Sequence, residues 1–163
     1  REQQLTTIQV DFNLPEKFDM FYVDADNQKK RPFMLHRALL GSLERFMGVL
    51  IEHTAGDFPV WLAPQQVKIL PITDDQIDYA QDVAAKLHQQ KVRVEVDTRS
   101  ATLSAKIRDA EKERVPYMLI VGGREEEKGE VTVRYRDQED QQTMTAEELV
   151  QEVTQKIEQK IYN

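Results

Sequence analysis

Cysteine is absent from the 163-residue sequence. Its absence excludes disulfide bonds and metal sites built from thiolates, and it fits a reducing compartment, so we expect a cytoplasmic protein. Long apolar runs are lacking as well. None approaches the roughly 18 consecutive residues that a membrane-spanning helix needs, and no secretory pattern is visible near the amino terminus. We therefore expect no membrane partner.

Two catalytic signatures are also missing. The sequence has no glycine-rich loop of the kind that cradles phosphates, and it offers no cysteine nucleophile. These absences weaken the hypothesis of a stand-alone α/β enzyme. Internal repeats and low-complexity segments are not found either. With 40% hydrophobic and 31% charged residues, the composition is that of an ordinary globular protein.

Negative charge is in excess, and the net charge of −7 argues against indiscriminate binding of polyanions. The excess is unevenly distributed along the chain. Residues 91–136 carry eleven Lys or Arg against nine Asp or Glu, whereas residues 137–163 carry two against seven. A local basic surface matters more for RNA than the average over the chain, so residues 91–136 are compatible with RNA binding.

Residues 1–53 predict the end of a larger sheet. Residues 5–12 alternate in the manner of a strand, and residues 18–23 predict a second strand that pairs with the first as a hairpin. A third strand over residues 33–36 leads into a helix over residues 39–52, on which Gly41 and Arg45 share a face. So few strands are too little for an independent domain.

Residues 54–64 predict a linker, because Gly56, Pro59 and Pro64 interrupt regular structure. Several apolar residues lie between these breakers. They predict a packed connector rather than a flexible tether.

Residues 65–163 alternate between strands and helices. Thr73 and Thr145 each begin a capping box that opens a helix, and the second of these helices directs Leu149, Val153, Ile157 and Ile161 inward. A further helix is expected after residue 102. The predicted strands cover residues 67–72, 92–96, 117–121 and 131–135. This βαβαββα order predicts an α/β fold with a mostly parallel mixed sheet flanked by helices.

Residues 36–46 contain the most informative group of side chains. An imidazole such as that of His36 can bind zinc, and the guanidinium of Arg45 offers a planar fork for phosphate oxygens or a stacked purine. Together with the residues on either side (31–35 and 48–53), this segment resembles motif 3 of the class II aminoacyl-tRNA synthetases, in particular the threonyl-tRNA synthetase family. The resemblance covers nearly the whole chain, because it extends in order to residues 7–15, 58–67, 106–108, 115–122 and 131–134.

The resemblance implies a carboxyl-terminal part of such an enzyme. Residues 1–53 would be a fragment of the antiparallel class II catalytic sheet, and residues 65–163 would be a class II anticodon-binding domain. The whole enzyme would activate threonine with ATP and Mg, transfer it to threonine tRNA, and act as a homodimer. Motifs 1 and 2 lie outside these residues, so we expect the isolated chain to be inactive.

The nucleotide-site residues are implied by the same resemblance. Arg45 would be the catalytic arginine that stacks on or pairs with ATP, and Gln4, Gly41 and Ser42 would lie beside the adenylate. A glycine at position 41 suits such a site, since it lets another group approach the backbone closely.

The implied threonine contacts are Thr7 and Gln9, which point to the same side of a strand. Thr6 departs from the family, which has Gly or Ala at this position. His36 would be one of three zinc ligands, and the other two would lie outside the chain, so the zinc site is incomplete here. Without the family pattern, a lone histidine on a strand is more often a hydrogen-bonded structural residue.

The implied anticodon contacts are Glu125 and Arg134, with Arg99 and Ser100 from the loop after the second strand of this domain. Arginine can make paired bonds to a base edge, and glutamate accepts from an exocyclic amine. Unpaired anticodon bases can reach such groups. Residues 100–102 depart from the family, which favours Asn followed by Glu-Lys.

The alternative function is that of a non-catalytic, synthetase-like accessory protein that binds tRNA or another nucleic acid. It would keep the same architecture. A pure binding module has no need of His36, Gly41 and Arg45, so their presence favours the ligase.

Overall fold

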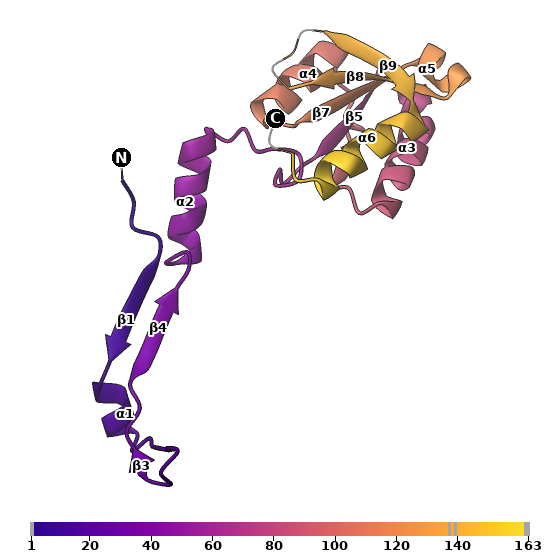
Figure 1. Cartoon of the computed structure of the whole chain (residues 1–163). Helices are drawn as coiled ribbons and strands as arrows, with labels where there is room; N and C mark the ends of the chain where they lie inside the picture. The colour runs from indigo at the N-terminus through magenta and orange to yellow at the C-terminus, as the bar shows by residue number, and fades with distance from the viewer. Residues whose placement is uncertain (1, 137, 139, 162–163) are drawn as a thin grey trace. The chain divides into compact units, whose positions relative to one another are not determined.

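The computed structural model describes residues 2–136, 138 and 140–161. The chain divides between Ala55 and Gly56 into two compact units, each described here by itself (Figure 1). No helix in the described part of the chain is long and apolar enough to cross a membrane.

The first unit is a long two-stranded ribbon with a helix after it (Figure 1). Its elements are β1 (Thr7–Asp11), α1 (Asn13–Lys17), β2 (Tyr22–Val23), β3 (Lys29–Lys30), β4 (Met34–Ala38) and α2 (Leu43–Thr54). Strands β1 and β4 pair antiparallel, with Gln9 opposite His36, and β2 pairs with β3.

The predicted hairpin of residues 5–12 with residues 18–23 is wrong, because the partner of β1 is β4. The physical reason lies at the end of β1. One carboxylate oxygen of Asp11 accepts the backbone N–H groups of Asn13 and Leu14, at 2.8 and 3.0 Å. These bonds turn the chain into the short helix α1 instead of a hairpin turn. The polar turn at Asp24 closes the β2–β3 pair instead.

Helix α2 begins at Leu43, four residues later than predicted. Ser42 is its N-cap, since its hydroxyl accepts the N–H of Arg45 at 3.2 Å. Gly41 lies before this cap with a positive φ of 68°, a conformation that glycine adopts without strain. The prediction that Gly41 and Arg45 share a helix face is therefore wrong, although the two residues remain close in the chain.

The first unit has almost no core of its own. Among its described residues only Pro15 and Thr54 are buried. Phe12 and Phe18 are 68% and 69% exposed, and large apolar side chains of β1, β4 and α2 are exposed as well. So many exposed large apolar side chains are unusual for a free-standing domain and indicate surface that another part of a protein covers.

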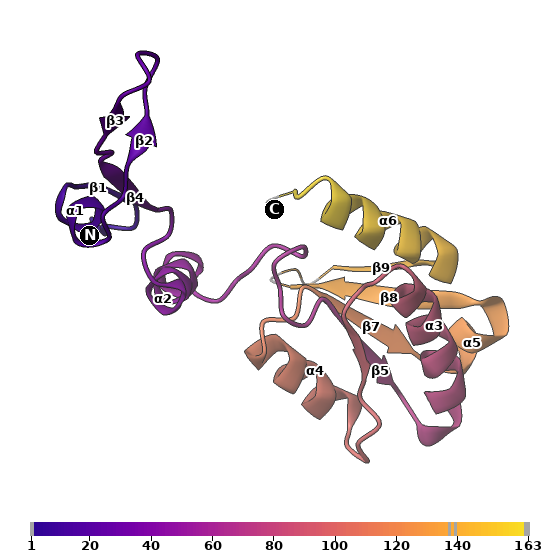
Figure 2. The same ribbon diagram turned by 90° about the horizontal axis from the view of Figure 1, so that it is seen from below.

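The second unit is an α/β domain with a five-stranded sheet in the order β6-β5-β7-β8-β9. Helices α3 and α6 lie on one face of the sheet, and α4 lies on the other (Figure 2). Its elements are β5 (Val67–Pro71), the 3₁₀ turn η1 (Asp74–Gln76), α3 (Ile77–Gln89), β6 (Val94–Val96), α4 (Leu103–Lys112), β7 (Tyr117–Val121), α5 (Gly123–Lys128), β8 (Glu130–Tyr135), β9 (Gln141–Thr145) and α6 (Ala146–Glu158).

The predicted α/β fold with a mixed sheet and flanking helices is confirmed, but the sheet is not mostly parallel, because two of its four strand pairings are antiparallel. Strand β5 pairs parallel with β6 and β7, whereas β8 pairs antiparallel with β7 and β9. The apolar run of β7 is buried at every residue and lies at the centre of the sheet, as its composition indicates. Helix α5 and strand β9 were not predicted. Both are mainly polar, so neither has the periodic apolar pattern on which such predictions depend.

The two capping boxes had different outcomes. At Thr145 the prediction is confirmed, because its hydroxyl accepts the N–H of Glu148, whose carboxylate accepts the N–H of Thr145. At Thr73 it is wrong. The Thr73 hydroxyl is 2.6 Å from Oε1 of Gln76, and the chain makes a 3₁₀ turn before α3. Ile161 is not directed inward either, since α6 ends at Glu158 and Ile161 is 37% exposed.

Residues of the predicted linker contribute to the second unit. Val60 is part of the core between the sheet and helices α3 and α6. The carbonyl of Val60 accepts a bond of 2.7 Å from the buried side chain of Gln66. The guanidinium of Arg93 donates to the carbonyl groups of Trp61 and Ala63. The segment before β5 is thus packed against this unit.

Candidate functional site

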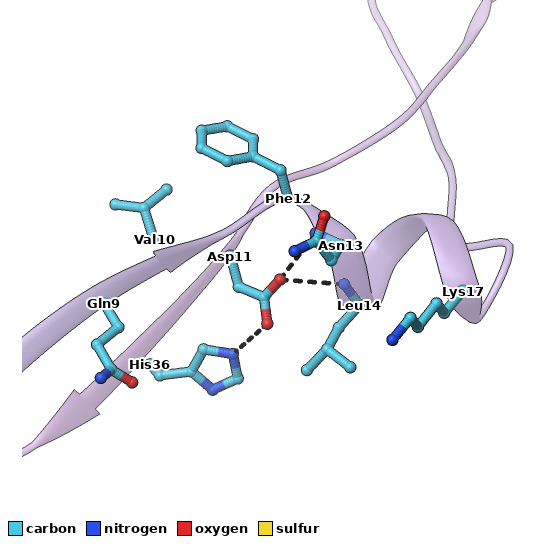
Figure 3. A pocket seen from close by; sticks show the side chains of 8 residues that line it. All are labelled: Gln9, Val10, Asp11, Phe12, Asn13, Leu14, Lys17 and His36. Atoms are coloured by element: carbon cyan, nitrogen blue, oxygen red, sulfur yellow. Dashed lines mark hydrogen bonds and ion pairs between the residues drawn. The ribbon is translucent and has the colours of Figure 1, made fainter.

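The β1–β4 ribbon places Gln9 and His36 directly opposite each other. Alternation along each strand puts Thr7, Gln9 and Asp11 on the same face as His36. Nε2 of His36 lies 3.2 Å from Oδ2 of Asp11 (Figure 3). Gln9, Asp11 and His36 line an open hollow of about 700 Å³, together with Val10, Phe12, Asn13, Leu14 and Lys17. The structure therefore brings the predicted threonine contacts and the predicted zinc ligand to one face.

Asp11 is an ionised, well-anchored acceptor. The backbone N–H of Leu14 is the main cause that lowers the pKa of its carboxyl group, and the N–H of Asn13 and the ring of His36 act in the same direction. A carboxylate that accepts several bonds is held in its charged form.

The predicted nucleotide contacts lie at the other end of the ribbon, where β1 begins and β4 ends. The hydroxyl of Thr6 donates to the carbonyl of Leu39 at 2.6 Å, which ties the two chain segments together. A Cβ atom at Gly41 would come within 3.2 Å of the carbonyl oxygen of Leu5, a tight contact, and the positive φ of 68° also favours glycine here. Gln4 precedes these contacts in the chain and is exposed. The departure at Thr6 thus has a structural role.

Arg45 lies in the first turn of α2 and is exposed. Its guanidinium makes no hydrogen bond or ion pair with any residue that the structure describes, so its N–H donors are available to a ligand. Ser42 caps the same helix end and can still donate its hydroxyl hydrogen. The exposed N–H groups of a helix start favour an anion such as phosphate.

The described residues contain no group of three or more His, Cys, Asp or Glu side chains that could hold a metal ion. His36 alone fits one position of a zinc site. Its Nε2 faces Asp11, whereas Nδ1 has no hydrogen-bond partner among the described residues (Figure 3). A histidine that bonds a carboxylate through one nitrogen and offers the other is typical of zinc ligands. The donor chemistry of His36 therefore fits one ligand position of a zinc site.

In the second unit, Glu125 and Arg134 lie on one face of the sheet. Oε1 of Glu125 accepts the hydroxyl of Thr132 at 3.1 Å, and Oε2 accepts the N–H of Gly122 at 3.0 Å. Thr132 and Arg134 alternate with buried Val133 on β8, so both side chains point to the same side. Thr143 on β9 lies beside Thr132, with 3.3 Å between the hydroxyl oxygens. The result is a polar face of hydroxyl, carboxylate and guanidinium groups.

Arg134 is oriented by helix α4. One terminal nitrogen donates to Oε1 of Glu111 at 2.8 Å, and the side chain is 25% exposed. Its Nε is buried without a hydrogen-bond partner among the described residues. Among the residues that the structure describes, a single charge-assisted bond holds the guanidinium and leaves part of its donor capacity unused.

Arg99 is bound within its own loop. Its guanidinium donates to both oxygens of Asp97, at 2.9 and 2.7 Å, and to Asp109 of α4 at 3.0 Å. Bonds from Arg99 are the main cause that lowers the pKa of the buried Asp97 carboxyl group. Lys106, also buried, donates to the backbone carbonyl of Asp97 at 3.1 Å. Arg99 is therefore committed to shaping this loop.

The loop of Arg99 and Ser100 is not beside the Glu125–Arg134 face. Strands β5 and β7 lie between β6 and β8 in the sheet. Strands are roughly 4.8 Å apart, so the separation is about 14 Å. Ser100 is exposed. The predicted anticodon contacts thus form two groups on either side of α4, a span that suits two neighbouring bases better than one.

Three residues with roles at these sites were missed by sequence reasoning: Asp11, Glu111 and Thr132. Asp11 lies on the same strand as the predicted threonine contacts Thr7 and Gln9, two residues after Gln9. This spacing could have predicted that Asp11 faces the same side. Thr132 precedes the predicted contact Arg134 by two residues on one strand, so it carried the same signal. Glu111 carried none, because it lies on a helix far from Arg134 in the sequence.

Two family models match this chain. The model described as "Anticodon binding domain" matches residues 66–156, and the model described as "tRNA synthetase class II core domain (G, H, P, S and T)" matches residues 1–54. The boundary between the two matches lies where the structure divides into its two units.

Curated relatives include threonine–tRNA ligases of Sulfurihydrogenibium sp. (strain YO3AOP1), 52% identical over 96% of this chain, and of Prosthecochloris aestuarii, 50% identical over 98% of it. The chain spans 24% of the length of each. A solved structure of the RNA-binding domain of threonyl-tRNA synthetase from Cryptosporidium parvum Iowa II is also similar. It has a TM-score of 0.83 and 37% identity, over 95% of this chain and 40% of that one. Prolyl-tRNA synthetase from Cryptosporidium parvum gives a TM-score of 0.75 and 27% identity, over 96% and 34%.

Proposed function

The chain belongs to the anticodon binding domain family, and on this premise we propose that it is the carboxyl-terminal part of a threonine–tRNA ligase. Residues 65–163 would bind the anticodon of threonine tRNA, and residues 1–53 would complete the site that activates threonine, with residues 54–64 joining them. The identity of about half the residues to threonine–tRNA ligases over nearly the whole chain supports this assignment.

The observation that carries the proposal is the polar face around Glu125, Thr132 and Arg134. Its groups can accept from and donate to the edges of unpaired bases, which is how RNA sequence is usually recognised. Thr132 holds Glu125 in place, and Glu111 holds Arg134. Groups that are oriented before binding lose little freedom when the base arrives. The second group, Ser100 with the loop shaped by Arg99, would contact a neighbouring nucleotide.

The first unit would supply part of the activation site. Arg45 would bind ATP, supplied with Mg, and Gln4, Gly41 and Ser42 would line the adenylate. Thr7 and Gln9 would contact threonine on the ribbon face that carries His36. Zinc, when bound by His36 and two ligands from outside these residues, supplies an open coordination position for the substrate.

The exposed apolar side chains of the first unit support its assignment as one part of a larger catalytic domain. Side chains such as Ile8 and Leu35 are 65% and 60% exposed, as expected for strands whose neighbours lie elsewhere in a larger sheet. We propose that the whole ligase is a cytoplasmic homodimer, and that the isolated chain neither forms threonyl adenylate nor charges tRNA.

Substitution of Arg134 by Ala in the full-length ligase tests the proposal. We expect kcat/KM for threonine tRNA to fall about ten- to hundred-fold and discrimination between anticodons to weaken, since a base-edge contact is worth about 1–3 kcal/mol. Adenylate formation without tRNA should be unchanged. The measurements are aminoacylation of wild-type and anticodon-variant tRNAs, and pyrophosphate exchange.

Arg108→Ala is the matched control, because Arg108 is an exposed arginine of α4. It should leave anticodon discrimination intact. If Arg134→Ala instead weakened all tRNAs equally and reduced the salt dependence, the arginine would contact phosphate rather than a base. Unchanged discrimination combined with lower stability would show a purely structural role.

A further inference from the structure

Asp11 does two separate things with its two carboxylate oxygens. Oδ1 accepts the backbone N–H groups of Asn13 and Leu14, at 2.8 and 3.0 Å, and so begins helix α1. Oδ2 points the other way, to Nε2 of His36 at 3.2 Å (Figure 3). Because two backbone bonds fix the first oxygen, the direction of the second oxygen is fixed as well.

This geometry selects one tautomer of His36. An ionised carboxylate can only accept hydrogen bonds, so Nε2 must carry the hydrogen. Neutral imidazole has a single ring hydrogen, which leaves Nδ1 with its lone pair. Nδ1 has no hydrogen-bond partner in the described part of the chain. The ring is therefore held with its free lone pair pointing away from Asp11.

We propose that Asp11 is a positioning residue that prepares His36 to bind zinc through Nδ1. The inference rests on the proposed function, in which His36 is one of the zinc ligands. A metal binds the nitrogen that lacks the hydrogen, so a partner that fixes the hydrogen on Nε2 also fixes the ligating atom and the plane of the ring. Asp11 acts through His36 and needs no contact with substrate.

The substitution Asp11→Asn separates this role from simple helix capping. The backbone N–H groups of Asn13 and Leu14 require an acceptor, so the amide oxygen must take the place of Oδ1. The amide NH₂ then faces Nε2 of His36. Two donors cannot share one contact, so Nε2 must become the acceptor and the hydrogen must move to Nδ1. The variant keeps the turn but presents the wrong nitrogen to the metal.

Asp24→Asn is the matched control. Oδ1 of Asp24 also accepts two backbone N–H groups, those of Asp26 and Gln28, each at 2.9 Å. Its other oxygen pairs with Lys30 rather than with a histidine. Asp24→Asn therefore makes the same chemical change in the same kind of turn without touching His36.

The experiment measures zinc affinity of the full-length ligase by competition with a chelator, and zinc content by elemental analysis. We expect Asp11→Asn to lower zinc affinity about ten- to hundred-fold and Asp24→Asn to leave it unchanged. Asp11→Ser is a second variant, because its hydroxyl can accept the turn bonds but is too short to reach His36. Asp11→Ser should also lower zinc affinity. If Asp11→Asn does not fold, this variant alone tests the role of Asp11.

Wild-type zinc affinity in a folded Asp11→Asn or Asp11→Ser variant would overturn the proposal while leaving the zinc assignment of His36 in place. If the wild-type ligase held no zinc, or if His36→Ala kept full zinc affinity, the zinc assignment itself would fail and the role of Asp11 with it. Loss of zinc in Asp24→Asn as well would show a general effect on the fold and would also count against the proposal.

Discussion

At the scale of single residues, charged side chains of the second unit hold one another in place around α4. Arg99 bonds Asp109, and Arg134 bonds Glu111. The buried Asp97 links the first of these pairs to the core. Arg134, which is proposed to face RNA, and Arg99, which shapes the neighbouring loop, thus both donate to carboxylates of α4. Under the proposed function, Glu111 would contribute to recognition without touching a base.

Asp97→Asn should destabilise the second unit by about 1–3 kcal/mol, the usual cost of leaving a buried donor unmatched. The amide NH₂ would face the guanidinium of Arg99 where a carboxylate oxygen now accepts. Urea unfolding of the full chain at pH 7 measures the change, with Asp78→Asn, an exposed position on α3, as the control.

The difference in stability between wild type and Asp97→Asn should depend on pH. The pKa of Asp97 is lowered in the folded state, chiefly by its bonds from Arg99. Its contribution to stability is therefore complete above the unfolded pKa of about 3.9 and is lost as the pH falls through the lower, folded value. The stability difference between wild type and Asp97→Asn should shrink in that acid range. A difference that stayed constant down to pH 2 would exclude an electrostatic cause.

At the scale of elements, two similar sequences begin helices in different ways. Thr145 and Glu148 form a reciprocal capping box at the start of α6. Thr73 and Gln76 have the same spacing, but Gln76 is buried and its amide oxygen accepts from the Thr73 hydroxyl. The Thr73 hydroxyl makes no cap bond to the backbone. The two starts thus differ in what the fourth side chain bonds: Glu148 bonds the backbone of Thr145, whereas Gln76 bonds the hydroxyl of Thr73.

Thr145→Ala should therefore cost about 1 kcal/mol of stability, the typical value of a lost N-cap, whereas Thr73→Ala should cost clearly less. Thermal unfolding of the two variants under the same conditions measures the difference. Equal losses would mean that the 3₁₀ turn at Thr73 contributes as much as a true cap.

At the scale of the whole molecule, apolar burial is divided very unequally. The second unit has a continuous core between its sheet and helices, whereas the described part of the first unit buries only Pro15 and Thr54. A protein fragment without a core gains too little from burial to offset the loss of chain entropy. The first unit should thus depend on packing partners that its own residues do not supply.

Residues 56–163 should fold alone with a single cooperative unfolding transition, and residues 1–55 alone should not. Hydrogen exchange of the whole chain should show slow amides in β7 and faster ones in β1. The measurements are circular dichroism of the two separate pieces and exchange on the intact chain. Equal protection of β1 and β7 in a monomer would contradict this division.

Several features could be predicted from the sequence because they depend on neighbouring residues. The apolar run of residues 117–121 predicted the central strand, and Thr145 with Glu148 predicted the start of α6. The family resemblance pointed to Glu125 and Arg134, which the fold brings to one face. The polar elements α5 and β9 were missed, since a strand at the sheet edge and a helix of six residues require little apolar periodicity.

The sequence by itself determined the α/β class, the position of the central strand, the cap of α6 and the residue types available at each site, because short-range patterns of apolar and capping residues specify them. Only the tertiary structure decided that β4 pairs with β1, that Asp11 reaches His36, and that Glu111 holds Arg134. These contacts join residues 23 or more positions apart. Many such pairings have similar local chemistry, and only the packing of the whole unit selects one of them.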